Sequence, residues 1–292
     1  MTDSLSKTSL LSSSLPPDRF VLRSRLHVTL IRPPRVSQNN ATFTGAFTPP
    51  ISLAYLAGAL IKNGVEVLTI DAIGEDPHKI TDEDGYNLLG LSFEDIVMRI
   101  PSTTSFIGLS CMFSQDWLSL KRLIRHIRKC FPSTLIIAGG EHITALPEES
   151  LRDCPGLDYC ALGEGEETIN EIALCIEQNN GFEEVDGVAF LRYDRYIQTP
   201  ARKRISAVDD IALPAWDLFP METFLSSKNQ LGLNRGRSMP ILATRGCPYE
   251  CTFCSSPAML GKLWMARKPT LVLDEIEHYI NKYRADNFDF YD

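Results

Sequence analysis

The sequence predicts an α/β protein whose first domain is an open, parallel, five-stranded sheet of the flavodoxin or Rossmann type. Three observations support this fold class. Short apolar segments recur between residues 26 and 181, longer amphipathic stretches separate them, and turns that contain glycine follow several of the segments. Short apolar strands that alternate with helices are typical of a parallel sheet covered on both faces. Ligands bind such sheets at the carboxyl ends of the strands.

The predicted strands of this domain are short and mostly apolar. They are His27–Ile31, Val65–Ile70, Phe106–Ser110, Leu135–Ala138 and Tyr159–Leu162. Helices are predicted over Ile51–Asn63, Gln115–Cys130 and Glu166–Gln178. The first helix follows a pair of prolines and ends before Gly64, which are common helix boundaries.

The remainder of the chain has a different pattern. A hairpin is predicted to turn near Tyr193–Asp194, and a proline-containing connector follows it. A strand at Pro240–Thr244 leads into a loop rich in cysteine, and then come a helix at Thr270–Arg284 and a strand at Phe288–Tyr291.

These patterns divide the chain into four regions. They are a serine-rich, disordered leader (1–25), the α/β domain (26–181), the hairpin with an interdomain connector (182–238) and the first part of a second domain (239–292).

The composition argues against nucleic-acid and membrane partners. The net charge of −8 disfavours nonspecific binding to nucleic acid or to an anionic membrane. The longest apolar run, Ile51–Ile61, is shorter than the roughly 20 residues that a membrane-spanning helix needs. The first residues lack the pattern of a signal peptide. We therefore expect a cytoplasmic protein.

Three of the eight cysteines, Cys247, Cys251 and Cys254, lie within eight residues. Thiolates select soft metals, chiefly zinc or the iron of an iron–sulfur cluster. A closed zinc site needs a fourth ligand, and no cysteine or histidine follows with finger-like spacing. The other five cysteines are scattered among apolar neighbours, and we expect them to be small buried residues without disulfides. They are Cys111, Cys130, Cys154, Cys160 and Cys175.

The cysteine loop, Arg245–Cys254, resembles the CxxxCxΦC signature of the radical SAM superfamily, with Phe253 at the aromatic position. The resemblance implies the start of a partial (β/α) barrel and a 4Fe-4S cluster on the three cysteines. It also implies that S-adenosylmethionine binds the open iron and is cleaved to a 5′-deoxyadenosyl radical. Phe253 and, at the end of the second barrel strand, Asp292 are the candidates for S-adenosylmethionine contacts. An ordinary aspartate at a strand end is the alternative for Asp292.

The first domain resembles the N-terminal domain of cobalamin-binding radical SAM proteins. Five segments carry the likeness: 31–34, 49–72, 106–114, 136–149 and 158–172. The resemblance implies that cobalamin binds at the strand ends. The candidate contacts are Ser110, beside the nucleotide tail; Met112, over the corrin together with Phe113; Gly139 and Gly140, which leave space; Gly163; and His142, as a loop-packing residue rather than a cobalt ligand.

One feature of many cobalamin carriers, a DxHxxG motif that supplies a histidine to cobalt, does not occur here. Asp76-Pro77-His78 matches only its start, and Thr81 stands where the motif has glycine. We therefore expect His78 to lie on the surface and cobalamin to bind without a protein imidazole.

Three functions are consistent with these features. The first is a cobalamin-dependent radical SAM enzyme that transfers a methyl group to an unactivated carbon. The second is an enzyme with the same cofactors that catalyses a radical rearrangement or cyclisation, and the third is a corrinoid-binding module without catalysis. An enzyme of this type needs a small-molecule substrate, which the sequence does not identify, and an external one-electron reductant. Arg245 is expected to orient the cysteine loop or a carboxylate, or to pack on Tyr249.

The second domain is short for a complete barrel. Residues 239–292 contain too little sequence for six units, since one βαβ unit takes about 30 residues or more. We therefore expect that the remaining barrel is lost or supplied by another chain, and that this chain alone is poorly soluble or inactive.

Overall fold

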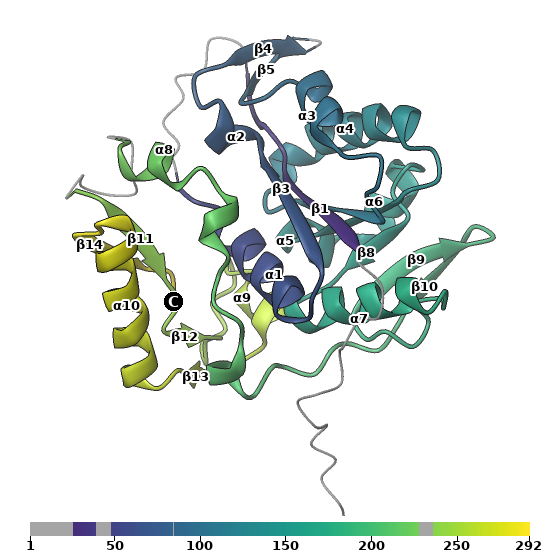
Figure 1. Cartoon of the computed structure of the whole chain (residues 1–292). Helices are drawn as coiled ribbons and strands as arrows, with labels where there is room; N and C mark the ends of the chain where they lie inside the picture. The colour runs from purple at the N-terminus through teal and green to yellow at the C-terminus, as the bar shows by residue number, and fades with distance from the viewer. Residues whose placement is uncertain (1–25, 39–47, 84, 228–235) are drawn as a thin grey trace, which may run out of the picture.

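The structure, a computed structural model, describes residues 26–38, 48–83, 85–227 and 236–292 (Figure 1). The predicted leader at 1–25 lies outside these ranges. Within them, no helix has both the length and the apolar content that crossing a bilayer requires.

A mostly parallel sheet forms the centre of the first domain. Its strands, in spatial order, are β10 (Arg195–Gln198), β9 (Val188–Arg192), β8 (Tyr159–Ala161), β7 (Leu135–Gly139), β6 (Phe106–Ser110), β1 (His27–Arg32) and β3 (Glu66–Asp71). The five strands from β8 to β3 pair in parallel. They are the five strands that the sequence predicts, so the α/β class with an open parallel sheet is confirmed.

The hairpin β9–β10 extends this sheet to seven strands and corrects the predicted number of five. β9 pairs antiparallel with β8, and β10 pairs antiparallel with β9. The hairpin turns at Tyr193 and Asp194, which both have positive φ, as predicted. The physical reason for the extension is the open edge of β8, whose backbone groups need partners. The buried side chains of Val188 and Phe190 continue the core at this edge.

Helices cover both faces of the sheet (Figure 1). One face packs with α1 (Ile51–Lys62) and α7 (Glu166–Glu177). The other face packs with α3 (Phe93–Arg99), α4 (Trp117–Cys130), α5 (Glu141–Ala145) and α6 (Pro147–Asp153). The two hydrophobic cores that result are typical of a doubly covered sheet.

Helix α1 is apolar nearly all round because it lies between the sheet and the connector. The Ala215 N–H donates to the Ala54 carbonyl oxygen at 2.9 Å. A Cβ at Gly58 would lie 2.1 Å from the Leu213 carbonyl oxygen, so only glycine lets the connector approach this closely. The connector itself contains the short helices η2 (Val208–Asp210), η3 (Trp216–Leu218) and α8 (Met221–Leu225).

Several elements between β1 and β6 were not predicted from the sequence. They are α2 (Ala72–Glu75), α3 and a small antiparallel sheet in the order β2 (Arg35–Gln38), β5 (Tyr86–Leu89), β4 (Ile80–Glu83). Helix α3 could have been predicted from the sequence, because Ser92 and Asp95 have the spacing of a capping box and form one at its first turn. The small sheet had none, since its strands are short and partly exposed.

The second domain begins with the predicted alternation of strand, loop, helix and strand. Its elements are β11 (Ser238–Ile241), β12 (Thr244–Arg245), α9 (Ser256–Leu260), β13 (Met265–Ala266), α10 (Pro269–Tyr283) and β14 (Asn287–Phe290). β11 and β14 pair in parallel, whereas β12 pairs antiparallel with β13.

The second domain shares a core with the α1 and α7 face of the first. Met239, Ile241 and Tyr279 are buried in the same hydrophobic cluster as the buried residues of α1 and α7. Trp216 of the connector donates its indole N–H to the Tyr279 hydroxyl at 2.9 Å. This shared core holds the cysteine loop close to the carboxyl edge of the sheet.

Candidate functional site

A cavity of about 430 Å³ lies between the carboxyl edge of the sheet and the cysteine loop. The strand ends contribute Ser110, Met112, Gly139, Gly140 and Gly163 to its wall. All five are among the residues that the sequence predicts at a cobalamin site. The cavity therefore has the place in the fold that an α/β sheet offers to a ligand.

Two glycines shape this wall through their backbone. Gly140 has φ +112°, and a Cβ there would lie 2.5 Å from the Cys111 carbonyl oxygen. Gly163 has φ +72°, which side chains rarely adopt. A Cβ at Gly139 would make only ordinary contacts, so glycine at that position simply leaves the cavity open.

The structure places His142 outside the cavity. Its Nδ1 lies 2.9 Å from the Ser114 Oγ, its Nε2 lies 3.4 Å from the Ser150 Oγ, and its ring packs on Trp117 with centroids 5.1 Å apart. Burial lowers the pKa of the imidazole, which favours its neutral form. Both ring nitrogens form hydrogen bonds with serine hydroxyl groups, so His142 is a packing residue. His78 is exposed, as predicted.

The cysteine loop forms the opposite wall of the cavity. Cys247 and Cys254 line it, whereas Cys251 is not part of the lining; Cys251 and Cys254 are both exposed. Phe253 is 91% exposed and is not part of the lining. Among the described residues, no three histidine, cysteine, aspartate or glutamate side chains converge as ligands of one metal ion.

The donor set of this loop nevertheless fits an iron–sulfur cluster. All three cysteines are free thiols, and none is buried in a core. Three soft donors on one loop can bind iron without any rearrangement of the surrounding core.

The other five cysteines are only in part the small buried residues that the sequence predicts. Cys111, Cys154 and Cys160 are buried, and burial raises the pKa of Cys111 to about 12. Cys175 is half-buried and Cys130 is exposed, so the prediction is wrong for Cys130. Cys130 is the last residue of α4, where the apolar stripe of the helix has already ended.

Asp292 lines the cavity, but its carboxylate is bound by the backbone. Its Oδ1 accepts from the N–H groups of Ala243 and Thr244 at 2.7 and 2.9 Å. The carboxylate therefore caps the backbone that enters the cysteine loop, a role that agrees with the structural alternative for this residue.

Arg245 makes the main polar contact across the cavity. Its guanidinium donates to Glu164 at 3.2 Å and to Glu166 at 2.5 Å, and it stacks over the Tyr55 ring at 5.2 Å. Tyr249, the packing partner considered from the sequence, is exposed. Burial opposes the charge of Arg245, but Glu166 and Glu164 keep its pKa above the ordinary arginine value.

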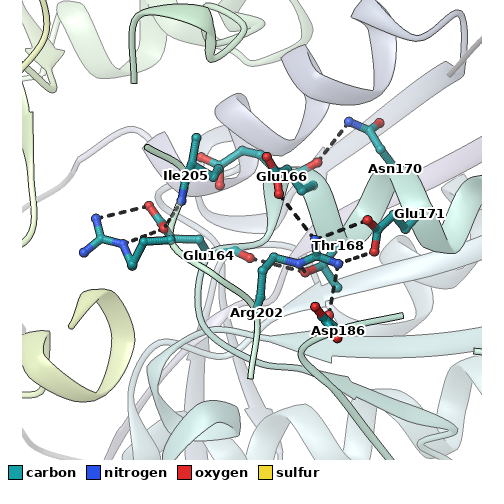
Figure 2. Close-up of polar contacts among 10 residues, drawn as sticks. Glu164, Glu166, Thr168, Asn170, Glu171, Asp186, Arg202 and Ile205 are labelled. Carbon is teal, nitrogen blue, oxygen red and sulfur yellow. Dashed lines mark hydrogen bonds and ion pairs between the residues drawn. The ribbon is translucent and has the colours of Figure 1, made fainter. Parts of the chain in front are cut away.

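Glu164 and Glu166 are site residues that the sequence did not single out. The Glu164 side chain is 3% exposed and also accepts from the Arg204 Nε at 2.6 Å and the Ile205 N–H at 3.2 Å. Figure 2 shows Glu164 and Glu166 beside the connector residues Arg202 and Ile205. The alternation of glycine and glutamate in residues 163–166, directly after a predicted strand, is the sequence signal that could have found them.

Comparison with known proteins identifies a domain in the chain and several relatives. The family model described as the B12 binding domain matches residues 41–173. An uncharacterized methyltransferase of Pyrococcus horikoshii is 27% identical over 91% of the chain, which spans 53% of that protein. The anaerobic magnesium-protoporphyrin IX monomethyl ester cyclase of Cereibacter sphaeroides is 30% identical over 87% of the chain, which spans 39% of that protein.

A solved structure shares the fold. The cobalamin-dependent S-adenosylmethionine radical enzyme OxsB, with aqua-cobalamin and S-adenosylmethionine bound, matches with a TM-score of 0.69 at 19% identity. The match covers 92% of this chain and 34% of that chain, so the likeness concerns the fold of the shared part. The chain thus spans about half or less of the length of its relatives. Residues 41–173 of the chain match the B12 binding domain, and with the three-cysteine loop that follows, the chain is similar to the cobalamin-binding radical SAM proteins.

Proposed function

We propose that this chain supplies the cobalamin-binding and cluster-binding parts of a cobalamin-dependent radical SAM methyltransferase. The observation that carries the proposal is the cavity of about 430 Å³, whose walls are the strand ends on one side and the cysteine loop on the other. A cofactor in this cavity contacts both domains at once.

The chain's own residues bind and orient the cofactors. Cys247, Cys251 and Cys254 are the thiol donors for a 4Fe-4S cluster, and Gly140 and Gly163 open the wall on which a corrin rests. When bound, the cluster, S-adenosylmethionine and cobalamin supply the radical and methyl-transfer chemistry. The cavity wall is mainly apolar, which keeps water away from reactive species.

The function also needs partners. An external one-electron reductant has to reach the cluster, and the exposure of Cys251 and Cys254 leaves the cysteine loop open to solvent for this purpose. The substrate of the proposed reaction is a small molecule.

A radical cyclisation with the same cofactors is the second candidate. It is favoured by the 30% identity to the cyclase of Cereibacter sphaeroides, which exceeds the identity to the Pyrococcus protein. Product mass separates the two reactions, since methyl transfer adds one methylene unit to the substrate and cyclisation adds none.

The test is anaerobic reconstitution of the chain with iron, sulfide and hydroxocobalamin, followed by desalting and metal analysis. We expect about four irons and one cobalt per chain, with iron lost in the Cys247→Ala/Cys251→Ala/Cys254→Ala variant. The matched control is Cys130→Ala/Cys175→Ala, which removes cysteines outside the loop and should retain iron. Cobalt without iron would leave only a corrinoid-binding module, and iron without cobalt would refute the cobalamin site.

A further inference from the structure

Both ends of the three-cysteine segment are bound to glutamates of the first domain. Arg245, two residues before Cys247, donates to Glu164 at 3.2 Å and to Glu166 at 2.5 Å. Ser255, directly after Cys254, donates its hydroxyl to a Glu141 carboxylate oxygen at 2.7 Å. The segment is thus attached on either side of its metal-binding thiols.

All three of these glutamates directly follow glycines of the cavity wall, and Glu166 follows Gly165. Glu141 follows Gly140, and Glu164 follows Gly163. In each strand-end loop, therefore, one residue faces the space where a corrin is expected and the next residue holds the cysteine loop. A displacement of the backbone at either glycine moves the carboxylate beside it.

The attachment at Arg245 is buried and geometrically constrained. The side chains of Arg245 and Glu164 are 12% and 3% exposed. Gly246, the next residue, has φ +86°, and a Cβ there would lie 2.2 Å from the Leu263 carbonyl oxygen. Buried, charge-assisted hydrogen bonds hold a fixed geometry, and breaking one partner leaves an unpaired charge. The entry to the cysteine loop therefore has little freedom.

We propose that Arg245 and Ser255 are positioning residues that clamp the three-cysteine segment to the strand-end loops of the B12-binding domain. Through this clamp, corrin binding in the cavity and the conformation of the cysteine loop are coupled, and the coupling acts in both directions. The inference rests on the proposed function for the identity of the ligand, whereas the clamp itself belongs to the chain without cofactors.

A purely structural role for Arg245 predicts a different result, and the chain offers a matched control. Arg202 is also a buried arginine of this region, with a side chain 8% exposed. Its hydrogen bonds go to Glu167, Thr168, Glu171 and Asp186, and none goes to the cysteine loop (Figure 2). Loss of Arg202 removes ion pairs of the same kind without touching the clamp.

The experiment is amide hydrogen exchange of the intact chain, with and without hydroxocobalamin. In the chain without cofactor, Arg245→Met should speed exchange in residues 246–256 about tenfold, and Ser255→Ala about threefold, whereas Arg202→Met should leave it within about twofold of wild type. Hydroxocobalamin should slow exchange in this segment in wild type and in Arg202→Met, but not in Arg245→Met.

Equal exchange of residues 246–256 in Arg245→Met and Arg202→Met would overturn the clamp, and so would undiminished protection by cobalamin in Arg245→Met. If Arg245→Met does not fold, Ser255→Ala decides the question, because it removes only one exposed hydroxyl. Failure of wild type to bind cobalamin refutes the proposed function instead, and the comparison without cofactor still tests the clamp.

Discussion

At the scale of single residues, backbone conformation and hydrogen-bond partners separate the roles of otherwise similar side chains. Gly246 and Gly261 both have positive φ, but only Gly246 is closely surrounded. His142 lies in α5 and His78 lies in the turn between α2 and β4, but only His142 is buried with partners on both nitrogens. These pairs allow matched substitutions.

Gly246→Ala should reduce the iron content of the reconstituted chain. The added Cβ meets the Leu263 carbonyl oxygen at 2.2 Å and the Arg204 Nη1 at 2.9 Å, so the start of the cysteine loop has to shift. Gly261→Ala is the control, since a Cβ there meets nothing within 4 Å and only the backbone strain of about 1–3 kcal/mol remains. Equal iron content in the two variants, measured after desalting, would contradict this account.

His142 should make the chain less stable as the pH falls below about 6.5, the ordinary pKa of histidine. Burial lowers the pKa of His142, so the unfolded chain takes up the proton first. Stability is therefore fully present above pH 6.5 and decreases as the pH drops toward the folded-state pKa. Urea midpoints at pH 7.5 and 5.5 should differ less in His142→Gln than in wild type. The same substitution at exposed His78 should preserve the wild-type difference.

At the scale of secondary structure, local signals explain where helices begin and end. Helix α3 starts at Ser92, whose hydroxyl accepts from the Asp95 N–H at 3.2 Å, while the Asp95 carboxylate accepts from the Ser92 N–H at 3.2 Å. This capping box places the buried Phe93 and Ile96 against α4. The capping box made this helix predictable from the sequence, although a helix of 7 residues is easily taken for a loop.

Ser92→Ala should lower the free energy of unfolding by about 1 kcal/mol, because the first turn of α3 loses its side-chain cap. The measurement is urea denaturation at pH 7. Ser226→Ala is the control, since the Ser226 hydroxyl only donates to the Glu222 carbonyl oxygen on an exposed helix end. A loss in Ser226→Ala as large as in Ser92→Ala would remove the capping explanation.

At the scale of the whole molecule, one core joins the connector, the second domain and the α1 and α7 face of the sheet. A buried chain of hydrogen bonds crosses it. Trp216 donates to the Tyr279 hydroxyl at 2.9 Å, and that hydroxyl donates to Glu275 at 2.6 Å. Glu275 also accepts from Arg267 at 2.6 Å. The two domains are therefore expected to unfold together.

Tyr279→Phe should loosen this contact, because it leaves the Trp216 indole N–H and a Glu275 oxygen without their partner. We expect a loss of about 1–3 kcal/mol for each buried group left unpaired. The measurement is urea denaturation monitored by tryptophan fluorescence, and limited proteolysis of the connector serves as a second probe. Tyr283→Phe removes an exposed hydrogen bond to Asp217 and should cost much less. Similar losses in both variants would show that the network is unimportant.

The sequence by itself determined the parallel sheet, its five strands, the beginning of the second domain and the three-cysteine loop. These features depend on local periodicity and on the spacing of residues that are close in the chain, so they can be read without coordinates. Candidate residues such as Ser110 and Gly140 were predictable because strand ends meet at one edge of a parallel sheet.

Only the tertiary structure decided what lies across the cavity from those residues. In the structure the hairpin β9–β10 pairs with the sheet, and His142 lies outside the cavity wall. Asp292 accepts hydrogen bonds from backbone N–H groups, and Arg245 donates to Glu164 and Glu166. Each of these contacts joins segments that are far apart in the sequence. Their partners are set by how the two domains pack, and hydrophobic spacing carries no information about which buried charge meets which.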